Sequence, residues 1–279
     1  MATTFRYPDY DIPVTLPEGL YEKQLLEFHP FSSWISTLKH SLDLQTSNPS
    51  HPFHSDPYML RSVTIQAFDL FGHDRLGFLK LASHVSNAAG ERLSGAVFLR
   101  GPSVAMLVML IPDDAPPDSD ERYVLLTVQP RVAAGSLEFV ELPAGMVDEA
   151  GNFAGTAARE IQEELGLEIP ASELKCLTEM AIPPGDGTTD VLQDGNLPRA
   201  TFPSPGGCDE YIPLFVHERR VPRPQLSDWT GRLTGLREEG EKITLKLVRM
   251  QHLWREAARD AKSLAALALW DGLRREGKL

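Results

Sequence analysis

The stretch that decides the fold is ELPAGMVDEAGNFAGTAAREIQEELGLEIP, residues 141–170, whose pattern indicates a strand end, a loop and a helix. Thr156 is a candidate N-cap, and Gly166 is the expected C-terminal stop, because glycine adopts the left-handed conformation that ends many helices. Three apolar residues recur at helical spacing and are expected to pack inward: Ala157, Ile161 and Leu165. The segment therefore predicts a short amphipathic helix.

The same helix carries a crowded set of carboxylates. Glu160 and Glu164 lie one turn apart, and like charges at this spacing destabilise a helix by roughly 0.2–0.5 kcal/mol. Arg159 and Glu163 are four residues apart and can pair, which leaves Glu160 and Glu164 without a cation nearby in the sequence. Divalent cations such as Mg²⁺ take carboxylate ligands and would relieve this repulsion. The alternative is an acidic helix face that contacts only solvent.

Composition limits the class of protein. The chain has 279 residues, of which 42% are hydrophobic and 24% charged, as in ordinary globular proteins. The net charge of −12 disfavours nucleic-acid binding, because an acidic protein repels a phosphate backbone, whereas a divalent cation can bridge acidic residues to a small phosphorylated ligand. Two cysteines are too few for a disulfide scaffold, and no apolar run suits a membrane span or a signal core. We expect a soluble cytoplasmic protein without a membrane partner, with an organelle as the alternative.

Strand and helix patterns are mixed along the chain without strict alternation. In chain order they predict a helix over 30–42, a hairpin over 59–85, a buried strand at Val104–Ile111, a strand at Thr178–Ile182, and a helix over 251–276 with Trp254 on its apolar side. This mixture indicates an α+β protein. We divide it into an N-terminal extension with a β-hairpin, residues 1–95, and a second domain, residues 96–279.

From Gly145 onward the sequence resembles the Nudix box, G-x5-E-x7-R-E-U-x-E-E-x-G-U, in which U is apolar. The other matching residues fall at the expected spacings: Arg159, Glu160, Ile161, Glu163, Glu164, Gly166 and Leu167. Gly151 departs from the pattern, because the family has a glutamate there that braces the loop, and Asp148 or Glu149 are candidate substitutes. The resemblance implies a Nudix fold, in which a mixed β-sheet lies between helices as an α/β/α sandwich, here with an N-terminal antiparallel β extension.

The resemblance also implies roles for the box residues. Glu160 and Glu164 would bind Mg²⁺ or Mn²⁺, and the backbone carbonyl of Ala144 would be a further ligand. Glu163 would assist them, and Arg159 would orient the carboxylates without contacting the substrate. A metal bound in this way lowers the pKa of a coordinated water and orients a diphosphate.

Two loops beyond the box resemble the ADP-sugar pyrophosphatase branch of the family, in particular the plant enzymes that hydrolyse ADP-glucose and ADP-ribose. In FPSPGGCDE, residues 202–210, Gly206 and Gly207 permit close backbone approach to a substrate, and Glu210 is a candidate for supporting the site. The alternative for this loop is an ordinary Pro-Gly turn.

The second loop is TGLREEGEKI, residues 234–243. The resemblance assigns to Glu239 the positioning or deprotonation of the attacking water, with Glu241 as its neighbour or as a metal contact. Which glutamate of the loop acts is open, and the alternative is a solvated acidic turn.

A third stretch, TVQPRV, residues 127–132, places Arg131 where the family has an arginine on the substrate phosphates, a role that suits its forked donors. The alternative is a surface arginine at a strand end. In this branch the N-terminal strands pack on a second subunit, so a homodimer is implied. Phe68, Phe71 and Phe78 are candidates for adenine stacking, with core packing as the alternative.

The combined expectation is a Mg²⁺-dependent enzyme that hydrolyses the diphosphate bond of ADP-ribose or ADP-glucose to AMP and a sugar phosphate. Its ligand would be a small nucleotide sugar. The alternatives are a Nudix hydrolase of another nucleotide, such as NADH or a different nucleoside diphosphate sugar, and a non-catalytic nucleotide-sugar sensor on a Nudix scaffold.

Overall fold

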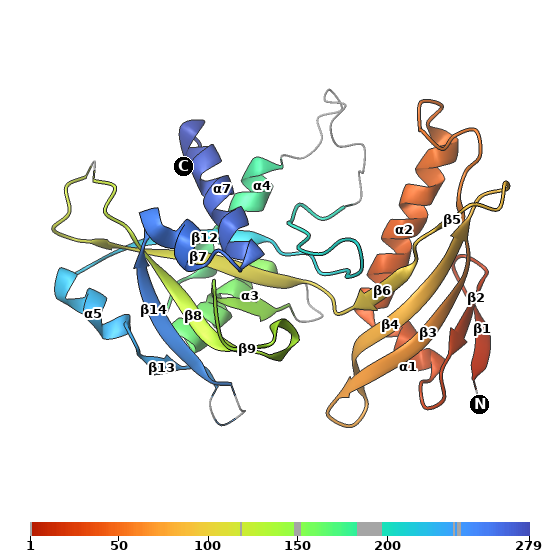
Figure 1. Ribbon diagram of the computed structural model, residues 1–279, viewed down its shortest axis with the longest axis horizontal. Helices are drawn as coiled ribbons and strands as arrows, with labels where there is room; N and C mark the ends of the chain where they lie inside the picture. The colour runs from red at the N-terminus through yellow and green to blue at the C-terminus, as the bar shows by residue number, and fades with distance from the viewer. Residues whose placement is uncertain (1, 118, 148–151, 183–196, 237, 239–240) are drawn as a thin grey trace. The chain divides into compact units, whose positions relative to one another are not determined.

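A computed structural model of the chain describes residues 2–117, 119–147, 152–182, 197–236, 238 and 241–279 (Figure 1). These residues form two compact units. The first unit contains the described residues of Met1–Pro102, Gly185–Pro198 and Ser204–Glu210, and the second contains those of Ser103–Pro184, Arg199–Pro203 and Tyr211–Leu279. The division of the chain between residues 95 and 96 stays a prediction.

The first unit is a sheet with a long helix against one face. Its elements are β1 (Thr3–Tyr7), β2 (Ile12–Leu16), α1 (Glu22–Leu26), α2 (His29–Ser47), β3 (Met59–Phe71), β4 (Arg75–Ser86), β5 (Arg92–Leu93) and β6 (Ala96–Leu99). The strand order is β1-β2-β3-β4-β5, with β6 beside β4, and every pair is antiparallel except the parallel pair of β2 with β3. The predicted hairpin is β3 and β4. Phe31 and Ile35 of α2 are fully buried in the core beneath them.

The three phenylalanines considered for adenine stacking pack within this unit. Phe68 is partly buried against the core. The rings of Phe71 and Phe78 lie 5.0 Å apart, edge to face, and Phe78 lies 5.5 Å from Phe98. Edge-to-face packing is the arrangement that aromatic quadrupoles favour. Packing therefore accounts for the positions of these rings.

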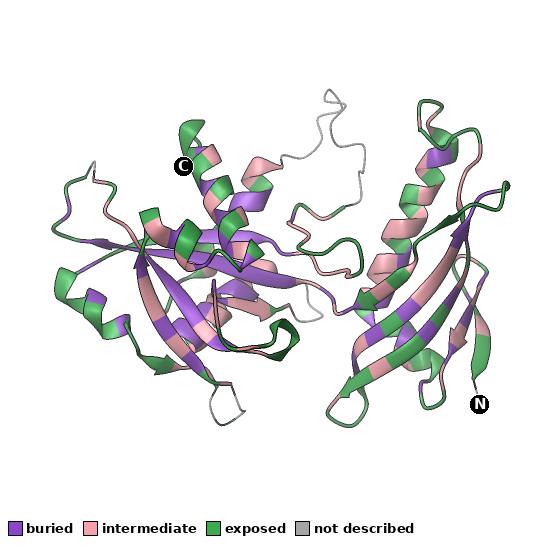
Figure 2. Cartoon of the chain, in the orientation of Figure 1, coloured by how far each residue is buried: buried purple, intermediate pink, exposed green. Residues whose placement is uncertain are grey.

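The second unit is built on a larger mixed sheet. Its strands are β7 (Ser103–Pro112), β8 (Tyr123–Arg131), β9 (Ser136–Glu141), β10 (Ala144–Met146), β11 (Lys175–Cys176), β12 (Leu214–Val221), β13 (Leu233–Thr234) and β14 (Ile243–Arg249). The order is β11-β12-β7-β8-β14-β13, with β10 beside β7 and β9 beside β8. Only β12 with β7 is parallel among these described pairs. The central strand β7 contains the predicted apolar run and is buried along its whole length (Figure 2).

Helices cover both faces of this sheet. The helical elements are α3 (Phe153–Glu160), η2 (Ile161–Leu165), α4 (Leu177–Ala181), α5 (Leu226–Trp229), α6 (Leu253–Glu256) and α7 (Ala261–Arg275), with short 3₁₀ turns η1 (Val132–Ala134), η3 (Ala171–Glu173), η4 (Arg223–Gln225) and η6 (Met250–His252). One buried cluster joins α3, η2 and α5 to the sheet, and another joins α4, α6 and α7 to its opposite face (Figure 1). The predicted arrangement of a mixed sheet between helices is thus confirmed.

Two predicted elements are wrong. Residues 177–181 form helix α4 rather than a strand, because leucine, glutamate, methionine and alanine all favour helix once Leu177 is buried. The predicted helix over 251–276 is broken before Ala261, where Asp260 starts α7 by accepting the N–H groups of Lys262 and Ser263. As a result, Trp254 is not on a buried face and is 57% exposed.

The helix of the opening segment begins earlier than predicted. Asn152 is its N-cap, and its side-chain oxygen accepts the N–H of Gly155 at 2.9 Å, whereas Thr156 is buried inside the first turns. The last turn, Ile161–Leu165, is a π-helix, a form that is rare and frequent at functional sites. Gly166 ends it in the left-handed conformation, with φ of 67°, as predicted.

The cap makes a prediction about stability. Asn152→Ala leaves an N–H of the first turn without its acceptor, so we expect it to lower the free energy of unfolding by about 1 kcal/mol, measured by urea denaturation. Asn152→Asp keeps the acceptor and is the control, expected near the wild type. An unchanged stability in Asn152→Ala would show that this cap does not stabilise the helix.

Candidate active site

The centre of the candidate site is the buried carboxylate of Glu164. It is 1% exposed, and its Oε2 accepts the N–H of Ala144 at 3.0 Å. The amide of Gln129, on β8, donates to its Oε1 at 3.5 Å. Burial and the nearby charge of Glu160 raise the pKa of Glu164 well above its usual value, although the Ala144 N–H opposes this shift. The loop before the box and strand β8 therefore both contact this one side chain.

Glu160 lies one turn earlier and packs against the backbone of Gly145. A Cβ at Gly145 would lie 1.9 Å from the Cδ atom of Glu160, so only glycine leaves room for the carboxylate. Burial and the charge of Glu163 raise the pKa of Glu160 to about 7, and Arg159 opposes the shift. The structure thus holds two carboxylates, Glu160 and Glu164, against the same strand, β10, in an environment that disfavours their negative charge.

Arg159 and Glu163 flank this pair. Nη2 of Arg159 lies 3.9 Å from Oε1 of Glu160, so the expectation that Glu160 has no cation nearby in the sequence is wrong. Arg159 is about half exposed, which suits the predicted orienting role. Glu163 is half-buried on the π-turn, and its charge acts on Glu160. All four box residues are therefore near one another, as the spacing predicted.

The loop between β13 and β14 is tied to the box helix at Thr234. Its hydroxyl donates to the backbone carbonyl of Glu164 at 2.5 Å. Glu241 closes the loop by accepting the N–H of Leu236 at 2.9 Å, and its charge raises the pKa of both Glu160 and Glu164. Glu241 is thus brought to the acidic pair. The predicted base, Glu239, lies outside the described residues.

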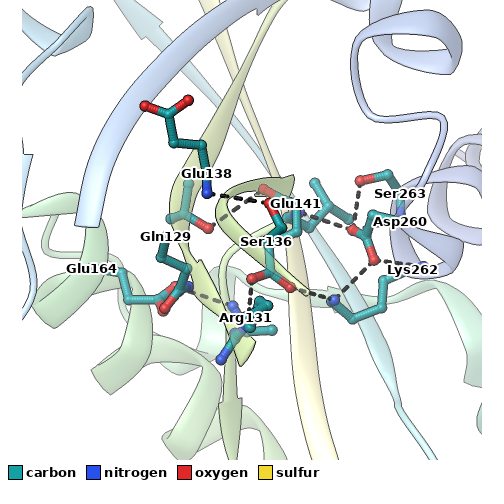
Figure 3. A network of polar contacts seen from close by, with 12 residues as sticks. Gln129, Arg131, Ser136, Glu138, Glu141, Glu164, Asp260, Lys262 and Ser263 are labelled. Atoms are coloured by element: carbon teal, nitrogen blue, oxygen red, sulfur yellow. Dashed lines mark hydrogen bonds and ion pairs between the residues drawn. The ribbon is translucent and has the colours of Figure 1, made fainter. Parts of the chain in front are cut away.

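Arg131, predicted to contact phosphates, is the last residue of β8. Its Nε donates to Oε1 of Glu141 at 2.6 Å, and its side chain is 42% exposed. Glu141 is buried, and its second oxygen accepts a hydrogen bond from Nζ of Lys262 at 2.8 Å (Figure 3). The charge of Glu141 also acts on Glu164, so Arg131 and its partners adjoin the acidic pair.

Sequence reasoning missed four residues of this network: Gln129, Glu141, Asp260 and Lys262. Lys262 and Glu141 are 121 positions apart in the chain, so no local spacing could join them. One signal was available, because Asp260 precedes an apolar helical pattern and aspartate is a preferred N-cap.

In this division of the chain, the first unit contains Gly206, Gly207 and Glu210, whereas the acidic pair belongs to the second unit. No atom lies within 4 Å of a Cβ added to either glycine, among the residues that the structure describes. Glu210 pairs with Arg100, whose Nη1 lies 3.1 Å from its Oε1. The predicted substrate roles of these three residues stay predictions.

The acidic pair fits a divalent cation. Mg²⁺ is typically bound by one or two carboxylates and completes its shell with waters and substrate phosphates. Glu160 and Glu164 supply two such groups, and the pKa of each is raised first by burial and then by neighbouring negative charge, both of which a cation would offset. Within the described ranges, no group of three or more His, Cys, Asp or Glu side chains is close enough to hold a metal, so further ligands would come from backbone, water or substrate.

Comparison with known proteins identifies the family of the chain. The model of the NUDIX domain matches residues 104–267. Nudix hydrolase 14, chloroplastic, from Arabidopsis thaliana is 39% identical over 220 residues, which are 78% of this chain and 64% of the relative, so less than two thirds of that relative is spanned. A solved structure of an ADP compounds hydrolase has a TM-score of 0.46 and 18% identity, and the match covers 79% of this chain and 99% of that chain.

The chain therefore belongs to the Nudix hydrolase family. The resemblance stated from the sequence is confirmed, and one relative is a plant protein, as that resemblance anticipated. Nudix hydrolases generally use divalent metal ions. In the part of the chain that the structure describes, no helix has the length and apolar character of a membrane span.

The raised pKa of Glu160 predicts how stability depends on pH. The pKa of Glu160 is about 7 in the folded protein and has its usual value of 4.5 in the unfolded chain. Between these two pH values the folded state binds more protons than the unfolded state, so the metal-free protein loses stability as pH rises through this range. Glu160→Gln removes that loss. At pH 8 without metal, we expect the variant to be more stable than the wild type by about 1–3 kcal/mol, and equal near pH 4.5, by thermal or urea unfolding.

The same variant tests metal binding. Mg²⁺ should raise the melting temperature of the wild type by a few degrees at pH 8 and of Glu160→Gln by much less, because the bound state loses one carboxylate ligand. Glu138→Gln, on an exposed residue of β9, is the control and should keep the wild-type shift. An equal Mg²⁺ shift in Glu160→Gln would refute a metal at this position.

Proposed function

We propose that the protein is a Mg²⁺-dependent hydrolase of ADP-sugars that forms AMP and a sugar phosphate from ADP-ribose or ADP-glucose. The observation that carries the proposal is the pair of carboxylates formed by buried Glu164 and half-buried Glu160, both held against the backbone at Ala144 and Gly145. The three stretches that resemble the ADP-sugar branch support the choice of substrate. A chain with a net charge of −12 suits a phosphorylated ligand only where positive charge meets it, and Arg159 supplies such a charge beside Glu160.

Glu160, Glu164 and the carbonyl of Ala144 would hold Mg²⁺, or Mn²⁺ in its place. When bound, the metal would lower the pKa of a water and neutralise charge on the diphosphate oxygens. Arg159 keeps the carboxylate of Glu160 oriented, and Glu163 adds negative charge beside it. Gly145 admits the carboxylate to the strand, so the ligand geometry depends on a residue without a side chain.

The reaction transfers one phosphoryl group to water. The water oxygen forms a bond to one phosphorus of the diphosphate, the bond from that phosphorus to the bridging oxygen breaks, and the bridging oxygen leaves with the other phosphate. A glutamate of the β13–β14 loop takes the proton of the water; we assign this to Glu239, with Glu241 beside the acidic pair. Thr234 ties the start of this loop to the box helix.

Arg131 would bind the phosphates through its two terminal amino groups, since its Nε is occupied by Glu141. Gly206, Gly207 and Glu210 would contribute to substrate binding. We include a homodimer in the proposal, because the N-terminal strands of the resembling enzymes pack on a second subunit. A cytoplasmic location stays a prediction, and the plant relative is chloroplastic.

A substrate panel tests the proposal. Incubation with Mg²⁺ and ADP-ribose, ADP-glucose, NADH or another nucleoside diphosphate sugar, with AMP followed by chromatography, should give the highest kcat/KM for an ADP-sugar. Glu164→Gln should lower that turnover at least ~100-fold without unfolding the protein, because it removes a metal charge but keeps an acceptor for the Ala144 N–H.

The panel also separates the alternatives. Preference for NADH or a non-adenine sugar would keep a Nudix hydrolase but reject the substrate class. Nucleotide binding without any product would indicate a sensor. Near wild-type turnover in Glu164→Gln would refute the metal assignment.

A further inference from the structure

A buried network of alternating charges lies beside the acidic pair and links it to the C-terminal helix. Along the network, Arg131 donates to Glu141, Lys262 donates to Glu141, and Lys262 also donates to Asp260 at 2.8 Å. Figure 3 shows Glu141 between Arg131 and Lys262. The two positive and two negative groups balance, which is the arrangement that makes buried charges tolerable.

Asp260 anchors this network to the fold. Its Oδ2 accepts the N–H and hydroxyl of Ser263 at the start of α7, and also the N–H of Leu142 next to Glu141. The side chain is 3% exposed. Asp260 therefore joins the start of α7 to Leu142, which follows β9. Its hydrogen bond from Lys262 restricts the position of Nζ of that lysine.

Glu141 depends on Lys262. Its side chain is 3% exposed and has one oxygen on Arg131 and the other on Lys262. Without Lys262, half of a buried carboxylate would lose its charged partner, which is strongly unfavourable. The carboxylate would then turn toward the partner that remains or toward water, and Arg131 would lose its fixed acceptor geometry.

The position of Arg131 suits contact with a substrate phosphate. A register shift interrupts the pairing of β8 with β9 between Gln129 and Arg131, with the extra residue on β9. Gln129 contacts Glu164, and Arg131 is two residues further along β8, so its side chain lies on the same face of the strand. Only Nε of Arg131 has a hydrogen-bond partner among the residues that the structure describes, and the fork of terminal amino groups remains available.

We propose that Lys262, anchored by Asp260, is a positioning residue that holds Glu141 and, through it, directs the terminal amino groups of Arg131 onto the diphosphate of the substrate. The inference deepens the proposed function and rests on its assignment of Arg131 to the phosphates. Lys262 itself does not contact the substrate. Its effect is therefore expected only while Arg131 is present.

A double-mutant cycle tests this dependence in the full-length protein. Binding of ADP with Mg²⁺ is measured by calorimetry, and kcat/KM for the ADP-sugar is measured in parallel. We expect Lys262→Met to weaken ADP binding about fivefold or more and Arg131→Ala about tenfold or more. Adding Lys262→Met to Arg131→Ala should change either quantity less than about twofold, because residues that act through one another are not additive.

Two further variants separate positioning from general stability. Lys262→Arg keeps the charge and should restore binding to within about threefold of the wild type. Lys246→Met breaks a comparable ion pair of the same unit, with Nζ 2.9 Å from Oε2 of Glu256, and should leave ADP binding unchanged. If Lys262→Met does not fold, Glu141→Gln replaces it in the cycle, because glutamine keeps the side-chain volume. This variant should weaken ADP binding on its own and change it little when Arg131→Ala is present.

The outcomes distinguish this inference from the proposed function. Equal ADP binding in Lys262→Met and the wild type, or the same loss with and without Arg131, overturns the positioning role even if ADP-sugars are hydrolysed. If the wild type binds ADP but hydrolyses no ADP-sugar, the proposed function fails, while a non-additive cycle still supports the positioning of Arg131. A wild type that does not bind ADP overturns both.

Discussion

The electrostatic conflict between Glu160 and Glu164 is the constraint on which the rest of the second unit depends. Two carboxylates one turn apart are withdrawn from water against β10, where each is disfavoured as an anion. The fold accommodates them in two ways. The backbone N–H of Ala144 donates to Glu164, and Gly145 has no side chain that would collide with Glu160. A bound cation would offset this cost, so the arrangement supports the proposed metal site over a solvated acidic face.

The sheet supplies the rigidity that this arrangement needs. Strand β10 pairs with β7, which is buried along its length, and β8 places Gln129 against Glu164 from the same sheet. The inward side of the box helix contributes Ala157, Ile161 and Leu165, all fully buried. Displacing the helix would therefore expose core residues, so hydrophobic packing fixes the backbone that carries the carboxylates, in addition to their own contacts.

Positive charge is organised around the same centre. The chain carries a net charge of −12, yet Arg159 lies at Glu160, while Arg131 and Lys262 enclose Glu141. Fixed positive charges close to an acidic pair suit the proposed binding of a metal and a diphosphate. The C-terminal helix is part of this organisation, because its N-cap, Asp260, also fixes Lys262.

The sequence predicted what local spacing determines. The proximity of Glu160 and Glu164, the apolar face of the box helix and its stop at Gly166 follow from the helical spacing, and the structure confirms these three features. The N-cap was misplaced because Asn152 and Thr156 are both suitable residue types, and burial of Thr156 decided between them. Glu141 and Lys262 could not be paired from sequence, since only the sheet topology brings them together.

The most direct test of the central claim is the position of the metal. Crystals grown with Mn²⁺ and measured at a wavelength that gives an anomalous signal should show a peak about 2.0–2.2 Å from carboxylate oxygens of Glu160 and Glu164, with the carbonyl of Ala144 adjoining it. A peak elsewhere in the protein, with none between these two glutamates, would contradict the account.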